Sequence, residues 1–161
     1  MGSCERKANV EKILVFDGNS ILNRAYYGIR PLTTRDGLYT HAVFGFLTTL
    51  LRLREEESPD AVCVTFDVHA PTFRHKMYAD YKAGRRPTPP ELLEQFAPAK
   101  EMLRAMGFTV VEKEGFEADD LIGTLANAAA DAGKEAYILT GDRDALQLIC
   151  LLYTSDAADD K

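Results

Sequence analysis

Hydrophobic positions along the chain alternate between short continuous runs and longer segments with helical spacing. The short runs have the length and the β-branched or aromatic content of strands, and they cover residues 13–16, 61–66, 108–111 and 136–139. Helical spacing predicts helices over residues 20–27, 41–57, 90–106 and 117–132, with another beginning near residue 143. This alternation predicts an α/β domain with a mostly parallel sheet and helices on both faces.

The ends of the predicted helices contain residues that favour starts and stops. Asn19 or Ser20 is expected to cap the first helix, and Thr40 the second. Pro90 suits a helix start, and Gly107 suits a helix stop. These signals support the predicted boundaries independently of the hydrophobic spacing.

Acidic residues gather where the predicted strands end. An aspartate closes or follows the apolar runs in KILVFDGN, AVCVTFD and YILTGDRD, and EGFEADD opens a helix. Because the carboxyl ends of parallel strands share one edge of a sheet, we expect these carboxylates to lie close together. They repel one another unless protons or divalent cations neutralise them, and Mg²⁺ or Mn²⁺ suits such oxygen ligands. Two such ions commonly drive phosphodiester cleavage. The predicted metal ligands are Asp17, Asp67, Glu117, Asp119, Asp120, Asp142 and Asp144.

Each acidic cluster taken singly has a simpler explanation. An Asp-Gly pair after a strand is most often a turn, and acids in the first turn of a helix stabilise its dipole. The segment 141–144 could be a cap with local ion pairs. These alternatives stay open for each cluster, whereas acids at the ends of three separate strands favour a shared metal site.

The segment 70–90 is basic in a chain whose formal net charge is −6. It contains five basic residues and one acidic residue, with tyrosines between the cations. Such a composition suits phosphate binding and stacking on unpaired bases, although a solvated loop with packed tyrosines is the alternative. The predicted nucleic-acid contacts in this segment are Arg74, Lys76, Tyr81, Lys82, Arg85 and Arg86.

The sequence lacks the motifs that are typical of several other classes of enzyme and binding protein. There is no Gly-x-Ser-x-Gly elbow, no phosphate-binding loop ending in Gly-Lys, and no histidine and cysteine set for zinc. No apolar run has the length of a membrane span or signal peptide, so we expect no membrane partner. The three cysteines have no metal-type spacing, which favours reduced thiols and a cytoplasmic protein.

Four long motifs together resemble a known family. VFDGNSILNRAYYG, TFDVHAPTFRHKMYADYKAGR, GFEADDLIGTLA and ILTGDRDALQLI are similar to the N-terminal 5′ nuclease domain of bacterial DNA polymerase I, in the flap endonuclease superfamily. The resemblance covers about residues 12–149 and implies a PIN-like 5′ nuclease fold. It also implies a 5′-3′ exonuclease and 5′-flap endonuclease that hydrolyses DNA and RNA primers in replication and repair.

The resemblance assigns roles to individual residues. Asp142 and Asp144 match acids around the second of two metal ions, and the other five predicted ligands match acids around the first. Lys82 and Arg86 match positions that contact the scissile phosphate, so we expect them to be catalytic. Arg24 is a further expected nucleic-acid contact, and Arg74 matches a phosphate contact. The implied substrates are DNA with a 5′ flap or nick and RNA–DNA primer junctions, on the bacterial nucleoid.

The resemblance and the residue pattern together predict the domain organisation. Residues 1–11 are expected to be a disordered N-terminus, and residues 12–149 a nuclease domain truncated at its C-terminus. The family continues with further strands and metal-binding aspartates, and a polymerase domain is expected to be linked in the parent protein. Residues 150–161 have no consistent period, and their back-translation resembles a sequencing adapter, so we expect a non-native tail.

Two other functions stay open from the sequence alone. A PIN-type ribonuclease would use the same acids on RNA, although such domains usually lack a basic segment like 70–90. A catalytically inert nucleic-acid-binding fragment would use the basic segment without turnover. Magnesium-dependent cleavage of a flap substrate distinguishes these alternatives from a 5′ nuclease.

Overall fold

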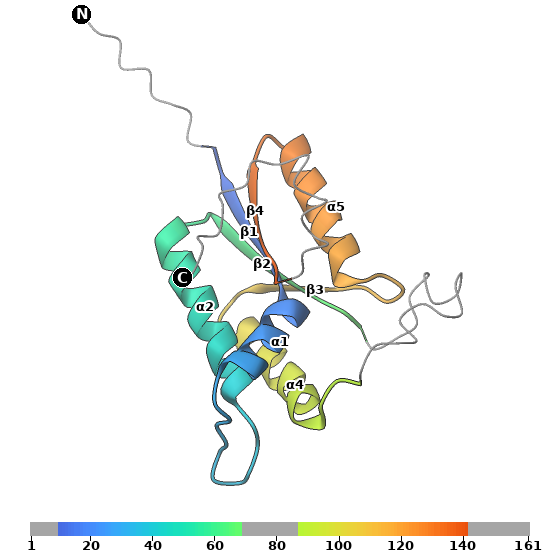
Figure 1. Ribbon diagram of the computed structural model, residues 1–161. Helices are drawn as coiled ribbons and strands as arrows, with labels where there is room; N and C mark the ends of the chain where they lie inside the picture. Colours follow the sequence, from blue (N-terminus) through green and yellow to red (C-terminus); the bar gives the residue numbers. More distant parts are fainter. Residues whose placement is uncertain (1–9, 69–86, 142–161) are drawn as a thin grey trace, which may run out of the picture.

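A four-stranded parallel sheet forms the centre of the protein (Figure 1). The computed structural model describes residues 10–68 and 87–141. The strands lie in the order β3-β2-β1-β4, so β1 and β2 are central. Their bounds are β1 Lys12–Asp17, β2 Ala61–Phe66, β3 Thr109–Glu112 and β4 Glu135–Leu139. The predicted α/β class with a parallel sheet is confirmed.

Helices cover both faces of this sheet, as the sequence predicts (Figure 1). On one face, α1, α2 and α4 share the larger hydrophobic core with β1 and β2. On the other face, α5 packs against β1 and β4 through small alanine side chains. Within the described residues, no helix is long and apolar enough to cross a membrane. The helices are α1 Gly18–Gly28, α2 His41–Glu57, α4 Pro90–Ala105 and α5 Ala118–Asp131.

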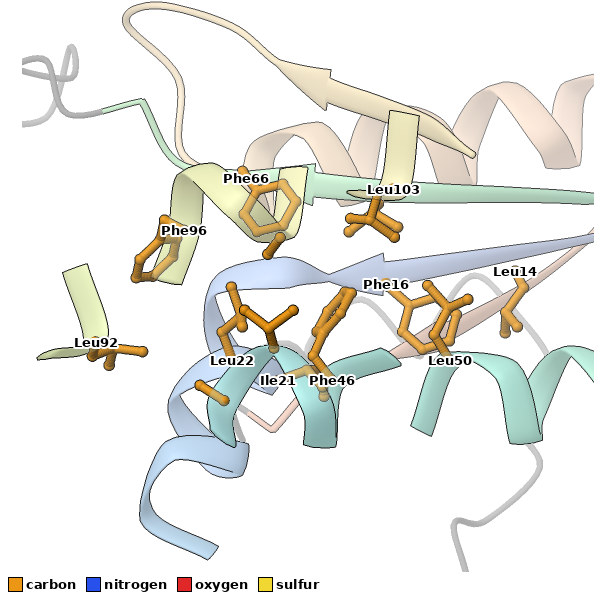
Figure 2. Packing of buried hydrophobic residues seen from close by; sticks show 14 residues of the cluster. Leu14, Phe16, Ile21, Leu22, Phe46, Leu50, Phe66, Leu92, Phe96 and Leu103 are labelled. Carbon is orange, nitrogen blue, oxygen red and sulfur yellow. The ribbon is translucent and has the colours of Figure 1, made fainter. Parts of the chain in front are cut away.

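Aromatic rings near the carboxyl ends of the two central strands contact one another in succession (Figure 2). The ring centroids of Phe16 and Phe46 are 6.3 Å apart, and those of Phe46 and Phe66 are 6.4 Å apart. Phe66 also contacts Phe96 of α4 edge-on at 6.3 Å. Because Phe16 and Phe66 are fully buried, the backbone is firmly packed immediately before Asp17 and Asp67.

The junction between β1 and α1 differs from the expectation. The helix begins directly after the strand, and its N-cap is Asp17, whose Oδ1 accepts a hydrogen bond from Ser20 N at 3.0 Å. The prediction that Asn19 or Ser20 caps this helix was therefore wrong. No turn separates the two elements, so the cap position falls on the last residue of the strand.

Backbone N–H groups at the start of α2 donate hydrogen bonds to a side chain of another helix. Thr40 occupies the N-cap position, as predicted, but its side chain makes no capping hydrogen bond. Instead the fully buried Gln95 of α4 accepts hydrogen bonds from Ala42 N at 2.8 Å and Val43 N at 3.3 Å. A side chain distant in sequence therefore satisfies donors that a helix start leaves unpaired.

The remaining boundaries agree with the sequence to within two residues. Three expectations fall wholly or mostly on residues outside the described part of the chain: the helix near residue 143, the basic segment 70–90 up to residue 86, and the tail 150–161. Residues 1–9 of the expected disordered N-terminus, residues 1–11, also lie outside the described part of the chain. Glu11 is described, and its carbonyl oxygen accepts a hydrogen bond from Glu135 N at 2.9 Å.

Candidate functional site

The carboxyl ends of β1 and β2 bring Asp17 and Asp67 to the same edge of the sheet. In the parallel register, Asp17 lies opposite Thr65, so Asp67 follows two residues later, just beyond the end of the neighbouring strand β2. The buried Thr65 also donates a side-chain hydrogen bond to the carbonyl oxygen of Phe16 at 3.2 Å. Adjacent strands lie about 4.8 Å apart, so this register places the two aspartates near each other.

Asp17 joins three elements through its carboxylate. Its Oδ1 accepts from Ser20 N in α1, and its Oδ2 accepts from Thr140 Oγ1, just after β4, at 2.9 Å. Ser20 Oγ in turn accepts a hydrogen bond from Gly141 N at 2.8 Å. Asp17 is only 4% exposed. The ends of β1 and β4 and the start of α1 are therefore held together around this carboxylate.

Asp67 joins α1 to α5. Its Oδ1 accepts a hydrogen bond from Ala118 N at 2.6 Å, at the first residue of α5. Its Oδ2 accepts from Asn19 Nδ2 at 3.1 Å, and its backbone N–H donates to Asn19 Oδ1 at 3.1 Å. The Asp67 carboxylate thus lies between the N-termini of two helices, where backbone N–H groups favour negative charge.

The start of α5 holds the other three predicted metal ligands that the structure describes, Glu117, Asp119 and Asp120. Glu117 is the N-cap residue, and a capping box links it to Asp120: each side chain accepts from the other residue's backbone N–H. Glu117 N lies 3.0 Å from Asp120 Oδ2. Asp119 lies in the same turn. Glu117 and Asp120 therefore have a capping role, which is compatible with a second role because each carboxylate oxygen has more than one lone pair.

The structure brings five of the seven predicted metal ligands to one region, at the ends of β1 and β2 and the start of α5. Within residues 10–68 and 87–141, however, no three acidic, histidine or cysteine side chains form a group that could hold a metal ion. The hydrogen bonds of Asp17, Asp67 and Asp120 direct carboxylate oxygens toward N–H and O–H donors. As a donor set these oxygens fit Mg²⁺ or Mn²⁺. Asp142 and Asp144 lie outside the described residues.

One predicted nucleic-acid contact, Arg24, can be placed. It is exposed on α1, one turn after Ser20. A Cβ built on Gly141 would lie 3.9 Å from Arg24 Cδ, so this side chain lies beside the end of β4. The other predicted contacts lie outside the described residues, namely Arg74, Lys76, Tyr81, Lys82, Arg85 and Arg86. The undescribed stretch that contains them lies between Val68 and Pro87 in the sequence, and Val68 directly follows Asp67.

Sequence reasoning did not assign Asn19, Ser20 and Thr140 to the site. All three hydrogen-bond to the acids or to the backbone that leads to them. Each is a small polar residue within three positions of a strand end. That position was the available signal, but such residues are equally typical of caps and turns.

Cys63 is not a candidate ligand or nucleophile in this site. It lies in β2 and is half-buried, and burial raises the pKa of its thiol. Since the thiolate is the reactive and metal-binding form, the Cys63 thiol stays protonated at neutral pH. This agrees with a site made of oxygen ligands.

Comparison with known proteins gives a family for this chain. Residues 12–158 match the 5′-3′ exonuclease N-terminal, resolvase-like domain family. DNA polymerase I of Caldicellulosiruptor bescii is 44% identical over 138 residues, which are 86% of this chain and 16% of that protein. DNA polymerase I of Mycobacterium tuberculosis H37Rv is 46% identical over 139 residues, 85% of this chain and 15% of that protein. The chain thus spans about one sixth of the length of these relatives.

Solved structures with lower sequence identity share the fold. T5 5′-exonuclease with bound zinc ions superposes with a TM-score of 0.65 at 20% identity, covering 86% of this chain and 52% of that one. The catalytic core of Rad2 in complex with a DNA substrate superposes with a TM-score of 0.52 at 14% identity, covering 94% and 45%. The predicted PIN-like 5′ nuclease fold is confirmed. Given the match over most of its length and these polymerase relatives, the chain belongs to the family of 5′-3′ exonuclease N-terminal, resolvase-like domains.

Proposed function

We propose that this chain is the catalytic part of a metal-dependent 5′ nuclease that hydrolyses phosphodiester bonds in DNA and in RNA primers. It would act as a 5′-3′ exonuclease and as a 5′-flap endonuclease during replication and repair. Its substrates would be DNA with a 5′ flap or nick and RNA–DNA primer junctions, in the cytoplasm on the bacterial nucleoid. A covalently linked polymerase domain in a longer parent protein is part of the proposal.

One observation carries this proposal: Asp17 and Asp67 meet at the edge of the sheet and are both bound to the first turn of α1. Asp67 is also bound to the start of α5, which holds Glu117, Asp119 and Asp120. Helix caps alone do not require acids from two adjacent strands and a second helix to gather in one place. Family membership supports the reaction class.

The residues divide the chemistry between them. The five described acids would hold one divalent ion, and Asp142 and Asp144 would contribute to a second. When bound, such ions stabilise the negative charge that develops during in-line phosphodiester hydrolysis. Lys82 and Arg86 would offset charge on the phosphate oxygens, while Arg24, Arg74, Lys76, Tyr81 and Arg85 would bind the nucleic acid.

Cleavage of a labelled 5′-flap DNA in Mg²⁺, with and without a chelator, tests the function. We would assay this chain and a chimera in which residues after Ile149 are replaced by the corresponding continuation of the C. bescii relative. The chimera is expected to release products with a 5′ phosphate and a 3′ hydroxyl, and the chelator is expected to stop the reaction. Single-stranded RNA serves as the second substrate.

The outcomes separate the proposed function from its alternatives. Preference for single-stranded RNA over the flap would favour a PIN-type ribonuclease. Flap binding by the chimera without any turnover in Mg²⁺ or Mn²⁺ would favour an inert nucleic-acid-binding module. Either result would refute the 5′ nuclease proposal.

Substituting Lys82 by alanine tests the role of the basic segment. In the chimera we expect cleavage to slow by about a hundredfold, as for loss of one positioned donor to a developing charge. The salt dependence of flap binding should also become shallower by about one unit in the log–log slope, since one phosphate contact is lost.

Lys134→Ala is the matched control for Lys82→Ala. Lys134 lies in the turn before β4 and pairs with Glu11, at the opposite edge of the sheet from the acids. We expect its loss to leave both the rate and the salt slope unchanged. Equal behaviour of the two variants would contradict the role given to Lys82.

A further inference from the structure

Asn19, in the first turn of α1, hydrogen-bonds to Asp67, the residue that follows β2. We propose that Asn19 is a positioning residue that sets the place of the Asp67 carboxylate and, through it, of the first turn of α5. The inference rests on the proposed function for its catalytic meaning, although the contacts themselves are structural. Asn19 would not touch the substrate; it would act through Asp67.

The amide of Asn19 binds Asp67 in both directions. Asn19 Oδ1 accepts from Asp67 N, and Asn19 Nδ2 donates to Asp67 Oδ2, each at 3.1 Å. Among side chains of this length, only an amide offers both an acceptor and a donor in one plane. The backbone and the carboxylate of Asp67 are therefore both held by the same group. These residues are 48 positions apart in the sequence.

Asp67 in turn binds the first residue of α5. Its other oxygen, Oδ1, accepts from Ala118 N at 2.6 Å. The first N–H groups of an α-helix have no partner within the helix, so the carboxylate supplies the acceptor for this donor. Hydrogen bonds from Asn19 to Asp67 and from Ala118 to Asp67 thus connect α1 to α5 across the end of β2. The position of Glu117, the residue before Ala118, depends on these hydrogen bonds.

Asn19 is uncharged, which allows it to hold a carboxylate that also binds a metal ion. A lysine or arginine at this position would also hold the carboxylate, but it would neutralise the charge and repel a divalent cation. An amide holds Oδ2 by one hydrogen bond and leaves the full negative charge and a further lone pair available. Asn19 can therefore orient a metal ligand without competing with the metal, as partners of metal ligands commonly do.

The test compares Asn19→Ala with the unaltered 161-residue chain. Amide hydrogen exchange, resolved by NMR, reports on the Asp67 and Ala118 N–H groups, whose acceptors are side chains. We expect both amides to exchange at least about tenfold faster in the variant. A titration with Mn²⁺, followed by water-proton relaxation, should show an affinity lower by about 10–100-fold, the usual effect of losing a partner of a metal ligand.

Two further variants complete the test. Asn127→Ala removes an exposed asparagine near the far end of α5 and is expected to change neither measurement. Asn19→Asp retains an acceptor for Asp67 N but loses the donor and adds a facing negative charge. We expect it to preserve the protection of the Asp67 amide and to lose that of Ala118, so it decides the question if Asn19→Ala does not fold.

Unchanged exchange at both amides in folded Asn19→Ala, or at Ala118 in Asn19→Asp, would overturn the proposal. Unchanged Mn²⁺ affinity together with faster exchange would also overturn it, since Asn19 would then be structural only. Failure of the proposed function has a different signature. The unaltered chain would bind no Mn²⁺ and its chimera would not cleave, while the exchange measurements would still show whether Asn19 positions Asp67.

Discussion

Replacing Asp17 by asparagine is expected to slow flap cleavage by the chimera about a thousandfold or more, while the domain stays folded. The loss corresponds to about 4 kcal/mol of transition-state stabilisation. Asparagine has nearly the same shape, caps helices as well as aspartate does, and still offers an oxygen to Ser20 N. The Thr140 hydroxyl can rotate to accept from the new amide. Only the negative charge is lost, so the rate measures the need for that charge.

Asp60→Asn is the matched control for Asp17→Asn. Asp60 also accepts a backbone hydrogen bond, from Lys12 N at 2.8 Å, but it lies at the amino edge of the sheet, before β2. Steady-state cleavage rates and thermal unfolding curves of both variants form the measurement. A fully active Asp17→Asn, or equal losses in both variants, would remove the basis for a metal site at the carboxyl edge.

Substituting Gly18 by alanine is expected to destabilise the domain by about 3 kcal/mol, which lowers the melting temperature by roughly 10 °C. A Cβ at this position would lie 2.5 and 2.6 Å from two carbons of the Phe66 ring and 2.7 Å from the carbonyl oxygen of Thr65. The ring is fully buried among the side chains shown in Figure 2, and Thr65 belongs to a central strand. Neither neighbour can move without disturbing the core, so the strain remains.

Gly28→Ala, at the other end of α1, is the control for this effect. A Cβ there meets nothing within 4 Å, and the residue does not have a positive φ. Alanine favours the helix more than glycine does, so we expect unchanged or slightly higher stability, by up to about 1 kcal/mol. Thermal and denaturant unfolding of both variants provide the measurement. Unchanged stability of Gly18→Ala would show that α1 can move away from β2 without cost.

Local sequence patterns predicted the secondary structure well, because helices and strands form according to residues that are close together in the sequence. The β-branched run in β2 and the apolar spacing of α2 give bounds that agree with the structure. The cap of α1 was missed because Asp17, Asn19 and Ser20 are all good capping residues. Only the length of β1 decides which of them occupies the cap position. The sequence also placed Asp17 and Asp67 at the same edge of the sheet, because parallel strands place their carboxyl ends together. Their role as metal ligands stays a prediction.

The sequence by itself determined the α/β class, the parallel sheet and the place of Asp17 and Asp67 at its edge, because these follow from local spacing and strand direction. Only the tertiary structure decided what each acid binds. Asp67 meets Asn19 and Ala118, and Asp17 meets Thr140, across separations of 48 to 123 residues. Pattern within one segment holds no information about such partners. They follow from the strand order β3-β2-β1-β4 and from the packing that brings the starts of α1 and α5 to the same edge.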